Sequence, residues 1–470
     1  MKTLSIALRN LFRNARRSIA TISGIAIGAI AILLFGGYKS NINYSMQTAY
    51  VRAGGHLQIQ QKDFFLYGSG NPSAYGIANY ERIITAIQSD PELRQMISVV
   101  TPTLQFNGIA GNYSAGVSRT IIGNGIVAAD QVKLRLWNPY QLHLDTPALR
   151  LANSSTDAAM VGLGLARVLH LCEALKISDC PQQVRAVSPT GGNIPADIAA
   201  LSSLEVDSRS AASGTKLDTD PARKIELLTS NPRGAPNVVS LNVIHAESQG
   251  FKEFDEIYVV LHLKQAQNLV YGAQRPKVTS IIIQLRDTHQ TAVARARIES
   301  TLQRYLQEES LAIRDYAFLN PFYVQSTDMF DTIFGFMFVL IGGIVMFTVS
   351  NTMNTTVVER TIEIGTLRAI GLRRSGIRLM FVLEGALLGL SGALVGLLLA
   401  LGAAAVINRL DLHWLPPGSA SPIPLELSVW GETTMIVGTT CGLILMATLS
   451  AWWPAYRAAR LNVVEALRHV

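Results

Sequence analysis

The sequence predicts an α-helical membrane protein with four transmembrane helices and a large α+β extracytoplasmic domain inserted between helices 1 and 2. Three observations carry this prediction. The 470 residues are 49% hydrophobic and only 16% charged, whereas soluble proteins average about 25% charged residues. Four long stretches are almost free of charge, and the excess of positive charge lies in the short segments that flank them.

Each of the four stretches is long enough to cross a membrane. Residues 18–38, 332–358 and 433–456 contain no Lys, Arg, Asp or Glu over 21, 27 and 24 positions. Residues 379–408 contain one charge, Glu384. An α-helix rises about 1.5 Å per residue, so about 20 residues span a hydrocarbon core of about 30 Å. Buried helices of soluble proteins are rarely this long and this poor in charge, which favours transmembrane helices.

The first stretch could also be a cleaved signal peptide, because basic residues precede it. Its apolar part is longer than the roughly 7–15 residues typical of signal peptides, and it lacks a small-x-small cleavage site before a polar start. We therefore expect a retained anchor. The predicted order is a cytoplasmic amphipathic segment (1–17), transmembrane helix 1 (18–38), the outer domain (39–328), transmembrane helix 2 (329–353), a cytoplasmic segment (354–376), transmembrane helix 3 (377–408), an outer loop (409–432), transmembrane helix 4 (433–453) and a cytoplasmic tail (454–470).

The distribution of charge predicts the orientation. Residues 1–17, 359–378 and 457–470 together contain 13 basic and 3 acidic residues, while the rest of the chain contains 27 basic and 30 acidic residues. Basic residues concentrate in the cytoplasmic segments of membrane proteins. Both termini are therefore expected in the cytoplasm and residues 39–328 outside it. This sorting explains the basic sequence without a nucleic-acid partner.

The outer domain mixes strand and helix signals. Residues 278–285 are β-branched and strand-like, and residues 290–307 have the apolar spacing of a helix. These signals predict an α+β fold, in one domain or two. Residues 173–233 are rich in Ser, Pro, Gly and Asp, which predicts a long loop insertion.

Two of the three cysteines are candidates for a disulfide. Cys172 and Cys180 lie in the outer domain, where an oxidising compartment would favour a bond between them. Cys441 lies within the fourth span and is expected to be an inert apolar residue. His170 is close to the pair, but a structural zinc site needs four ligands, so we expect no metal site.

The third span combines a glycine-rich face with one charge. Gly385, Gly389 and Gly392 or Gly396 fall on nearly one face, which would let another helix approach closely. Glu384 is an intramembrane acid, and such residues are functional candidates by default. A structural group bonded to a neighbouring helix is the equal alternative.

Residues 358–371 carry the most specific pattern in the sequence. They read Val-Glu-Arg-Thr-Ile-Glu-Ile-Gly-Thr-Leu-Arg-Ala-Ile-Gly, which resembles the ER-x-x-EIG-x-LRAIG segment of FtsX-like ABC permeases. This family includes MacB-type exporters and the lipoprotein-releasing permeases. The resemblance covers nearly the whole chain except 173–233, and its other matching runs are 8–11, 16–17, 24–28, 160–166, 254–256, 454–460 and 464–467. One departure is Val463, where the family usually has Pro.

The resemblance implies a type VII, or mechanotransmission, mechanism. Such permeases pair with an identical or paralogous permease, bind two ATPase subunits and move their outer domains when ATP is bound and hydrolysed. Residues 354–376 would then form a coupling helix against the ATPase. The resemblance assigns this role to Glu359, Arg360, Glu363, Ile364, Gly365, Leu367, Arg368, Ala369 and Gly371.

The amphipathic pattern of this segment agrees with such a role. Its apolar residues are expected to seat in a groove of the partner, and its charged residues to reach polar groups at the rim. The apolar residues are Ile362, Ile364, Leu367 and Ile370. The charged residues are Glu359, Glu363 and Arg368. Without the resemblance, a solvated cytoplasmic loop would be the simpler interpretation.

The sequence does not predict an enzyme. It contains no G-x-x-x-x-G-K-[ST] phosphate-binding loop, no Ser/His/Asp constellation and no paired carboxylates. We therefore expect no catalytic, cofactor-binding or metal-binding residues, with ATP and Mg²⁺ bound by a partner subunit. MacB-type exporters carry their ATPase ahead of the first span, where this sequence has only 17 residues. This makes its expected architecture closer to the lipoprotein-releasing LolC/LolE-type permeases.

The expected function is a permease subunit that extracts or expels an amphiphilic cargo, with lipoprotein release favoured. Efflux of a lipid, peptide or drug with a periplasmic adaptor is the first alternative. The second is an FtsX-like signalling permease that controls a cell-wall hydrolase, although those proteins have a much smaller outer domain. Further expected partners are membrane lipids and a periplasmic adaptor or lipoprotein carrier. The expected location is a bacterial inner membrane, with the large domain in the periplasm.

Overall fold

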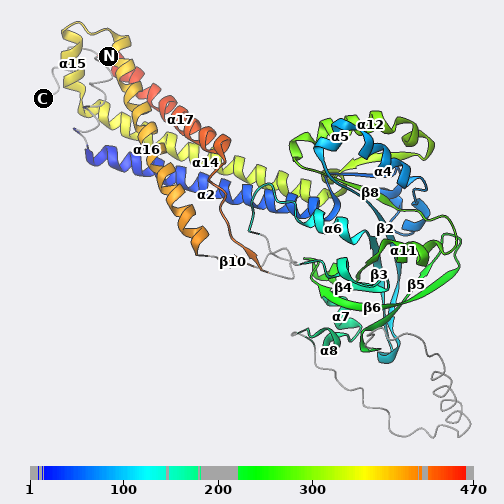
Figure 1. The fold of residues 1–470 in the computed structure, drawn as a ribbon. Helices are drawn as coiled ribbons and strands as arrows, with labels where there is room; N and C mark the ends of the chain where they lie inside the picture. Colours follow the sequence, from blue (N-terminus) through cyan, green and yellow to red (C-terminus); the bar gives the residue numbers. More distant parts are fainter. Residues whose placement is uncertain are drawn as a thin grey trace, which may run out of the picture. The chain divides into compact units, whose positions relative to one another are not determined.

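The computed structural model describes residues 9, 13, 15–143, 148–177, 180, 221–410, 412–414 and 422–461. Most of the N-terminal segment 1–14, most of the insertion expected at 173–233, and tail residues 462–470 with Val463 lie outside the described residues. The chain divides into two compact units, both visible in Figure 1. A helical unit contains the residues up to Tyr50 and those from Asn320 onward, and an α+β unit contains Val51–Leu319.

The helical unit contains four helices that are long and apolar enough to cross a membrane: α2 (Ala15–Gly54), α14 (Pro321–Glu359), α16 (Arg374–Arg409) and α17 (Thr433–Arg460). Together with the α+β unit inserted between α2 and α14, they confirm the predicted fold class. Each helix continues beyond its apolar stretch. In α2, residues 38–53 contain neither Gly nor Pro, so the helix ends only at Gly54.

The glycines of α16 allow close packing inside the helical unit. A Cβ atom at Gly389 would lie 2.7 Å from the Cβ of Ala447 in α17, and one at Gly396 would lie 2.7 Å from the Ala26 carbonyl oxygen in α2. Side chains at these positions would force the helices apart. The glycine-rich face predicted from the sequence therefore contacts two helices of the same chain.

The α+β unit is built on one nine-stranded sheet, in the order β3-β7-β4-β6-β5-β2-β8-β1-β9. The strands are β1 (Leu57–Gln61), β2 (Ile97–Asn112), β3 (Val117–Ile126), β4 (Ala158–Gly162), β5 (Lys224–Ser230), β6 (Pro236–Glu247), β7 (Tyr258–His262), β8 (Ser280–Leu285) and β9 (Leu311–Asp315).

The long strand β2 joins two parts of this sheet. Its second half pairs with both β3 and β5, so the six strands from β3 to β2 close into a ring. Its first half pairs with β8, which continues through β1 to β9 as an open arm. Helices α4 (Tyr80–Ser89) and α12 (Thr291–Glu308) pack on each other, and they contact β2 and β9 respectively. The predicted strand at 278–285 and helix at 290–307 correspond to β8 and α12.

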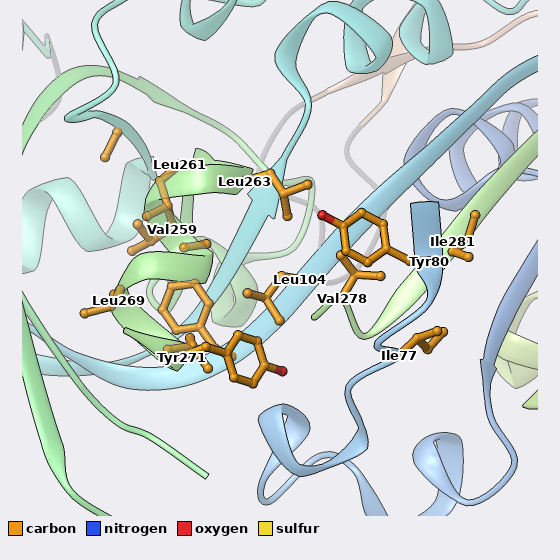
Figure 2. Packing of buried hydrophobic residues seen from close by; sticks show 14 of the residues in the cluster. Ile77, Tyr80, Leu104, Val259, Leu261, Leu263, Leu269, Tyr271, Val278 and Ile281 are labelled. Carbon is orange, nitrogen blue, oxygen red and sulfur yellow. The ribbon is translucent and has the colours of Figure 1, made fainter. Parts of the chain in front are cut away.

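Alternation along the strands builds the core of this unit. Leu104 of β2 points to the same side as Val259 and Leu261 of β7, and all three are buried (Figure 2). Helix α11 (Leu263–Tyr271) covers them with Leu269 and Tyr271. Alternate residues of a strand point to opposite faces, so the other face of β2 carries polar residues such as Gln105.

One part of the predicted loop insertion is wrong. Residues 224–230 form strand β5, which pairs with β2 and β6. The residues of this strand alternate in burial, with Ile225 and Leu227 fully buried. The Ser-, Pro- and Gly-rich residues before and after it concealed this short pattern.

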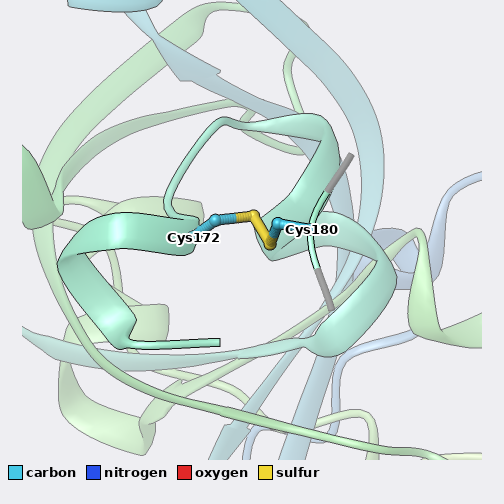
Figure 3. The surroundings of a disulfide bond; sticks show 2 residues. All are labelled: Cys172 and Cys180. Atoms are coloured by element: carbon cyan, nitrogen blue, oxygen red, sulfur yellow. A yellow bond between two sulfur atoms is a disulfide. The ribbon is translucent and has the colours of Figure 1, made fainter. Parts of the chain in front are cut away.

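A disulfide joins Cys172, the first residue of α8 (Cys172–Leu175), to Cys180 (Figure 3). The two Cα atoms lie 6.2 Å apart. This is the cysteine pair expected from the sequence. Cys441 in α17 is a free cysteine.

Candidate functional site

The candidate site is the short helix α15 (Thr361–Ala369), which lies between α14 and α16 in the sequence. Arg360 separates it from α14, and the Ile364 amide donates to the Arg360 carbonyl oxygen. Gly371 ends the helix with φ of +100°, while its amide donates to the Arg368 carbonyl oxygen. Residues with side chains are strained at this φ, so glycine is favoured where the chain turns from α15 towards α16.

A buried ion pair joins the start of α15 to α16. Arg360 and Glu384 are each 5% exposed, and Arg360 Nη1 lies 3.5 Å from Glu384 Oε2. Burial of a charge is costly unless the charge is paired. Of the two roles considered for Glu384, the geometry favours the structural one, because its carboxylate balances a buried guanidinium from the neighbouring segment.

Glu363 extends this pair into a chain of charges. One carboxylate oxygen accepts from Arg360 Nε at 3.2 Å, and the other accepts from Arg13 Nη2 at 2.5 Å. The Arg13 hydrogen bond lowers the pKa of Glu363 below its usual value. Glu363 of α15 is therefore bound between the α14–α15 junction and the residues just before α2.

A second contact with α2 lies beside the first. The two terminal guanidinium nitrogens of Arg17, Nη1 and Nη2, donate to Glu359 at 2.6 and 2.5 Å. Glu359 is the last residue of α14, and its side chain is about half exposed. Solvent screens an exposed pair of this kind and makes its contribution to stability small, so its main effect is to orient the first turn of α2 against the end of α14.

Arg368 attaches the other end of α15 to α17. Its Nη1 donates to the Leu461 carbonyl oxygen at 2.7 Å and lies 3.5 Å from that of Ala459. These carbonyl groups are at the C-terminal end of α17, where helical carbonyl oxygens lack partners and carry partial negative charge. Arg368 therefore caps α17 and fixes the position of α15.

The apolar residues of α15 divide into a buried and an exposed set. Ile364 is 1% exposed and packs in the core of the helical unit, and Gly365 is also buried. Ile362 and Ile370 are 52% and 80% exposed, and Val358 at the end of α14 is 72% exposed. The exposed set can contact a partner directly, whereas Ile364 positions the helix from behind.

A groove of about 380 Å³ runs between α15 and α16. Ile362 and Leu367 line it from α15, and Met380 and Phe381 from α16, while Arg13 and Glu363 add charged groups. The site thus combines an apolar groove with charged residues that are already bound within the chain. This composition is typical of a surface that receives another protein.

Comparison with known proteins identifies this region. Residues 332–463 match the family described as FtsX-like permease C-terminal. The chain contains an FtsX-like permease domain. This domain includes α15, α16, α17 and most of α14, and therefore every candidate coupling residue predicted from the sequence.

Curated relatives of the permease domain are ABC transporter permeases. The macrolide export ATP-binding/permease protein MacB of Nitrobacter winogradskyi is 30% identical over 44% of this chain and 30% of its own length. The lipoprotein-releasing system transmembrane protein LolC of Neisseria meningitidis is 24% identical over 54% of this chain and 62% of its own length. The ABC transporter permease YtrF of Bacillus subtilis is 34% identical over 25% of this chain and 28% of its own length. The chain thus spans less than two thirds of each relative.

A solved structure, the periplasmic region of MacB from Actinobacillus actinomycetemcomitans, matches 57% of this chain and 92% of its own chain. The sequence identity is 12% and the TM-score is 0.28.

The arrangement differs from the sequence-based expectation in one respect. Glu359, Glu363 and Arg368 were expected at the rim of a partner's groove, but each has a partner within the permease domain or the N-terminal segment. Ala369 is exposed and Leu367 is half-buried. Sequence reasoning missed the roles of Arg13 and Arg17, although five basic residues without an acid in 1–17 were a usable signal. The described residues contain no group of three metal-ligating side chains.

Proposed function

We propose that this chain is the permease subunit of an ABC transporter and that a separate ATPase subunit drives it through α15. The exposed apolar set Val358, Ile362 and Ile370 carries the proposal, because these residues lie at the end of α14, in α15 and directly after α15, within the FtsX-like permease domain. The permease works in this proposal as a pair, with a second copy or a paralogue, and each permease binds one ATPase subunit. ATP and Mg²⁺ bind to the ATPase subunits.

The ion pairs and the Arg368 hydrogen bond suggest how force leaves α15. A displacement of this helix pulls on α2 through Arg13, on α16 through Arg360 and on α17 through Arg368. These contacts hold only at short distance, and the Arg360–Glu384 pair is buried. In this proposal α15 therefore moves together with the ends of the three helices. The α+β unit is continuous with α2, and in this proposal it is the part that acts on the cargo.

The proposed location is a bacterial inner membrane, with both termini in the cytoplasm and the α+β unit in the periplasm. The concentration of basic residues in 1–17, 359–378 and 457–470 supports this orientation. The disulfide between Cys172 and Cys180 supports an oxidising compartment for the α+β unit.

The proposed cargo is amphiphilic, and a lipoprotein released from the membrane is favoured. The LolC relative supports this choice, because the match extends over more of its length than the matches to MacB or YtrF. Efflux of a lipid, peptide or drug with a periplasmic adaptor is the alternative that the MacB relatives support. An FtsX-like signalling permease that controls a cell-wall hydrolase is a further alternative.

Replacement of the exposed isoleucines tests the ATPase contact. The double variant Ile362→Glu/Ile370→Glu is expected to lose an ABC ATPase subunit of the same organism that co-purifies with the native chain, because each carboxylate would be buried in the contact. Val293→Glu is the matched control, since Val293 is 63% exposed on α12 of the other unit. If the double variant retained the ATPase fully, α15 would not be part of the contact with the ATPase.

Depletion of the chain tests the cargo. Lipoproteins that accumulate in the inner membrane would support release. Unchanged lipoprotein distribution together with new sensitivity to a drug would support efflux instead. Septation or cell-wall defects without either change would support the signalling permease.

A further inference from the structure

The adjacent ends of α16 and α17 bring arginines and aromatic residues together. The guanidinium carbon of Arg378 lies 5.2 Å from the ring centre of Tyr456 and 5.9 Å from that of Trp452. The guanidinium carbon of Arg460 lies 4.3 Å from the same Tyr456 ring. Two cations therefore share one aromatic ring and lie within one Debye length of each other, which is about 10 Å at 0.1 M salt.

No carboxylate compensates these cations in the part of the chain that the structure describes. Among the described residues, Glu359 forms a salt bridge with Arg17, Glu363 with Arg13 and Arg360, and Glu384 with Arg360. Arg378 Nε is buried and has no hydrogen-bond partner among the described residues. An anion outside the chain would be held by the terminal N–H groups of Arg378 and Arg460, because among the described residues no hydrogen bond or salt bridge engages either guanidinium group.

The surroundings indicate where that anion comes from. Trp452 and Trp453 are 54% and 63% exposed and end the apolar stretch of α17. Tryptophan and tyrosine are enriched where a membrane-spanning helix passes through the lipid headgroups. The cluster of Arg378, Tyr456 and Arg460 therefore lies at the level of the lipid headgroups. The phosphate group of a lipid is closer to this cluster than a phosphate dissolved in bulk water.

Two simpler explanations account for part of the cluster. A positive residue such as Arg460 is favoured at the C-terminal end of α17, where the helix dipole is negative. Basic residues are also common at the cytoplasmic ends of transmembrane helices. Neither explanation requires Arg378 to lie against Tyr456 with its Nε buried and unpaired, four residues into α16.

We infer that Arg378, Tyr456 and Arg460 form a binding site for the phosphodiester of an anionic phospholipid. The guanidinium groups would hold the phosphate oxygens, because their planar N–H groups match the geometry of phosphate, and Trp452 would cover the adjoining glycerol region. Basic pockets between transmembrane helices bind anionic headgroups in this way. The inference depends on α16 and α17 crossing a membrane and is independent of the ATPase and the cargo.

Native mass spectrometry of the full chain in detergent tests the site. The purified protein is titrated with phosphatidylglycerol or with phosphatidylcholine of the same acyl chains. The native chain is expected to retain phosphatidylglycerol in preference to phosphatidylcholine. Arg378→Gln and Arg460→Gln are each expected to weaken this retention about fivefold, since an arginine at a membrane surface contributes about 1 kcal/mol to the attraction of anionic lipid.

The matched control is Arg409→Gln, which removes the same charge from the exposed last residue of the same helix. It is expected to keep the native preference. Arg378→Lys preserves the charge and the fold but removes the planar donor group, and it is expected to weaken retention less than Arg378→Gln. Its behaviour tests the site even if Arg378→Gln fails to fold.

Three outcomes would overturn the inference. Equal retention of the two lipids by the native chain would exclude a site for anionic headgroups. If glycerol 3-phosphate displaced the bound phosphatidylglycerol as strongly as added phosphatidylglycerol does, the ligand would be a soluble phosphate. Unchanged lipid retention in both arginine variants, with loss of the co-purifying ATPase, would assign the arginines to a protein contact.

Discussion

Arg360 and Glu384 are the pair on which the local electrostatics of α15 depend. Both are buried, but their surroundings are unequal: Arg360 also contacts Glu363, whereas Arg360 is the one salt-bridge partner of Glu384 among the described residues. Loss of the arginine therefore leaves a buried carboxylate unpaired, while loss of the carboxylate leaves an arginine with one remaining partner.

This asymmetry predicts the order of two substitutions. Arg360→Met is expected to lower the free energy of unfolding by about 3–5 kcal/mol, and Glu384→Leu by less. The double variant is expected to recover most of the loss, because apolar residues of similar volume can replace a buried ion pair. Denaturation in detergent measures all three. Equal losses for the two single variants, or additive losses in the double variant, would contradict this account.

His56 is a buried neutral histidine in the α+β unit. The Leu285 amide donates to its Nδ1 at 3.0 Å, so the ring proton is on Nε2, which lies 3.0 Å from Thr288 Oγ1. The rings of Trp137 and Tyr316 contact it edge-on. Burial lowers the pKa of His56 to about 4, although Asp287 partly opposes the shift.

The low pKa predicts a loss of stability in mild acid. Between pH of about 6.5 and about 4 the unfolded chain binds a proton at this residue and the folded chain does not, so the free energy of unfolding falls as the pH is lowered. A shift of this size corresponds to about 3 kcal/mol across that interval. Denaturation at pH 7.5 and pH 5 measures the part of this change above pH 5, which is about 2 kcal/mol. His56→Gln cannot titrate and is expected to show a smaller pH dependence, and an unchanged one would assign the acid sensitivity to other groups.

At the scale of helices, glycine positions in α16 differ sharply in the space around them. A Cβ at Gly396 would meet the backbone of α2, whereas one at Gly402, six residues further along, would meet nothing within 4 Å. The close approach of α16 and α2 thus depends on particular glycines and not on the overall glycine content.

This contrast gives a matched pair of variants. Gly396→Val is expected to destabilise the helical unit by about 1–3 kcal/mol through overpacking. Gly402→Val changes the same residue type in the same helix and is expected to have little effect. Thermal denaturation of the full chain in detergent compares them. Similar midpoints for the two variants would contradict the packing of α16 on α2.

The elements differ in how well the sequence predicts them. The four membrane-length helices follow directly from stretches with at most one charged residue, because a span requires a run of apolar residues that is visible locally. Their ends were not predictable in this way, since α2 continues through polar residues among which no Gly or Pro interrupts the helix before Gly54. Strand β5 and the ring that β2 closes depend on pairing between distant residues, for which single strands carry no signal.

The candidate site shows the same division. The charged and apolar residues of α15 were identified from their pattern and from the family resemblance. The structure adds which of them face inward: Ile364 packs in the core, and Glu363 and Arg368 bind within the chain. In a short helix that has contacts on both sides, the pattern of apolar and charged residues does not tell which side faces the rest of the chain and which faces outward.

At the scale of the whole molecule, the two units are linked through few segments of chain. Helix α2 enters the α+β unit at Val51, and the chain leaves this unit at Leu319, before α14 begins. Among the described residues, the backbone passes between the helical unit and the sheet through α2 and the segment leading into α14.

The entry and the exit of the inserted unit are themselves neighbours. Strands β1 and β9 pair antiparallel from Leu57↔Asp315, and the Tyr316 amide donates to the His56 carbonyl oxygen at 3.0 Å. The α+β unit thus begins and ends on two neighbouring, hydrogen-bonded strands. A different folded domain whose termini are equally close could be inserted between His56 and Tyr316. The distance between the two points of attachment would not change. Related chains could in this way exchange the α+β unit while keeping the same helical unit.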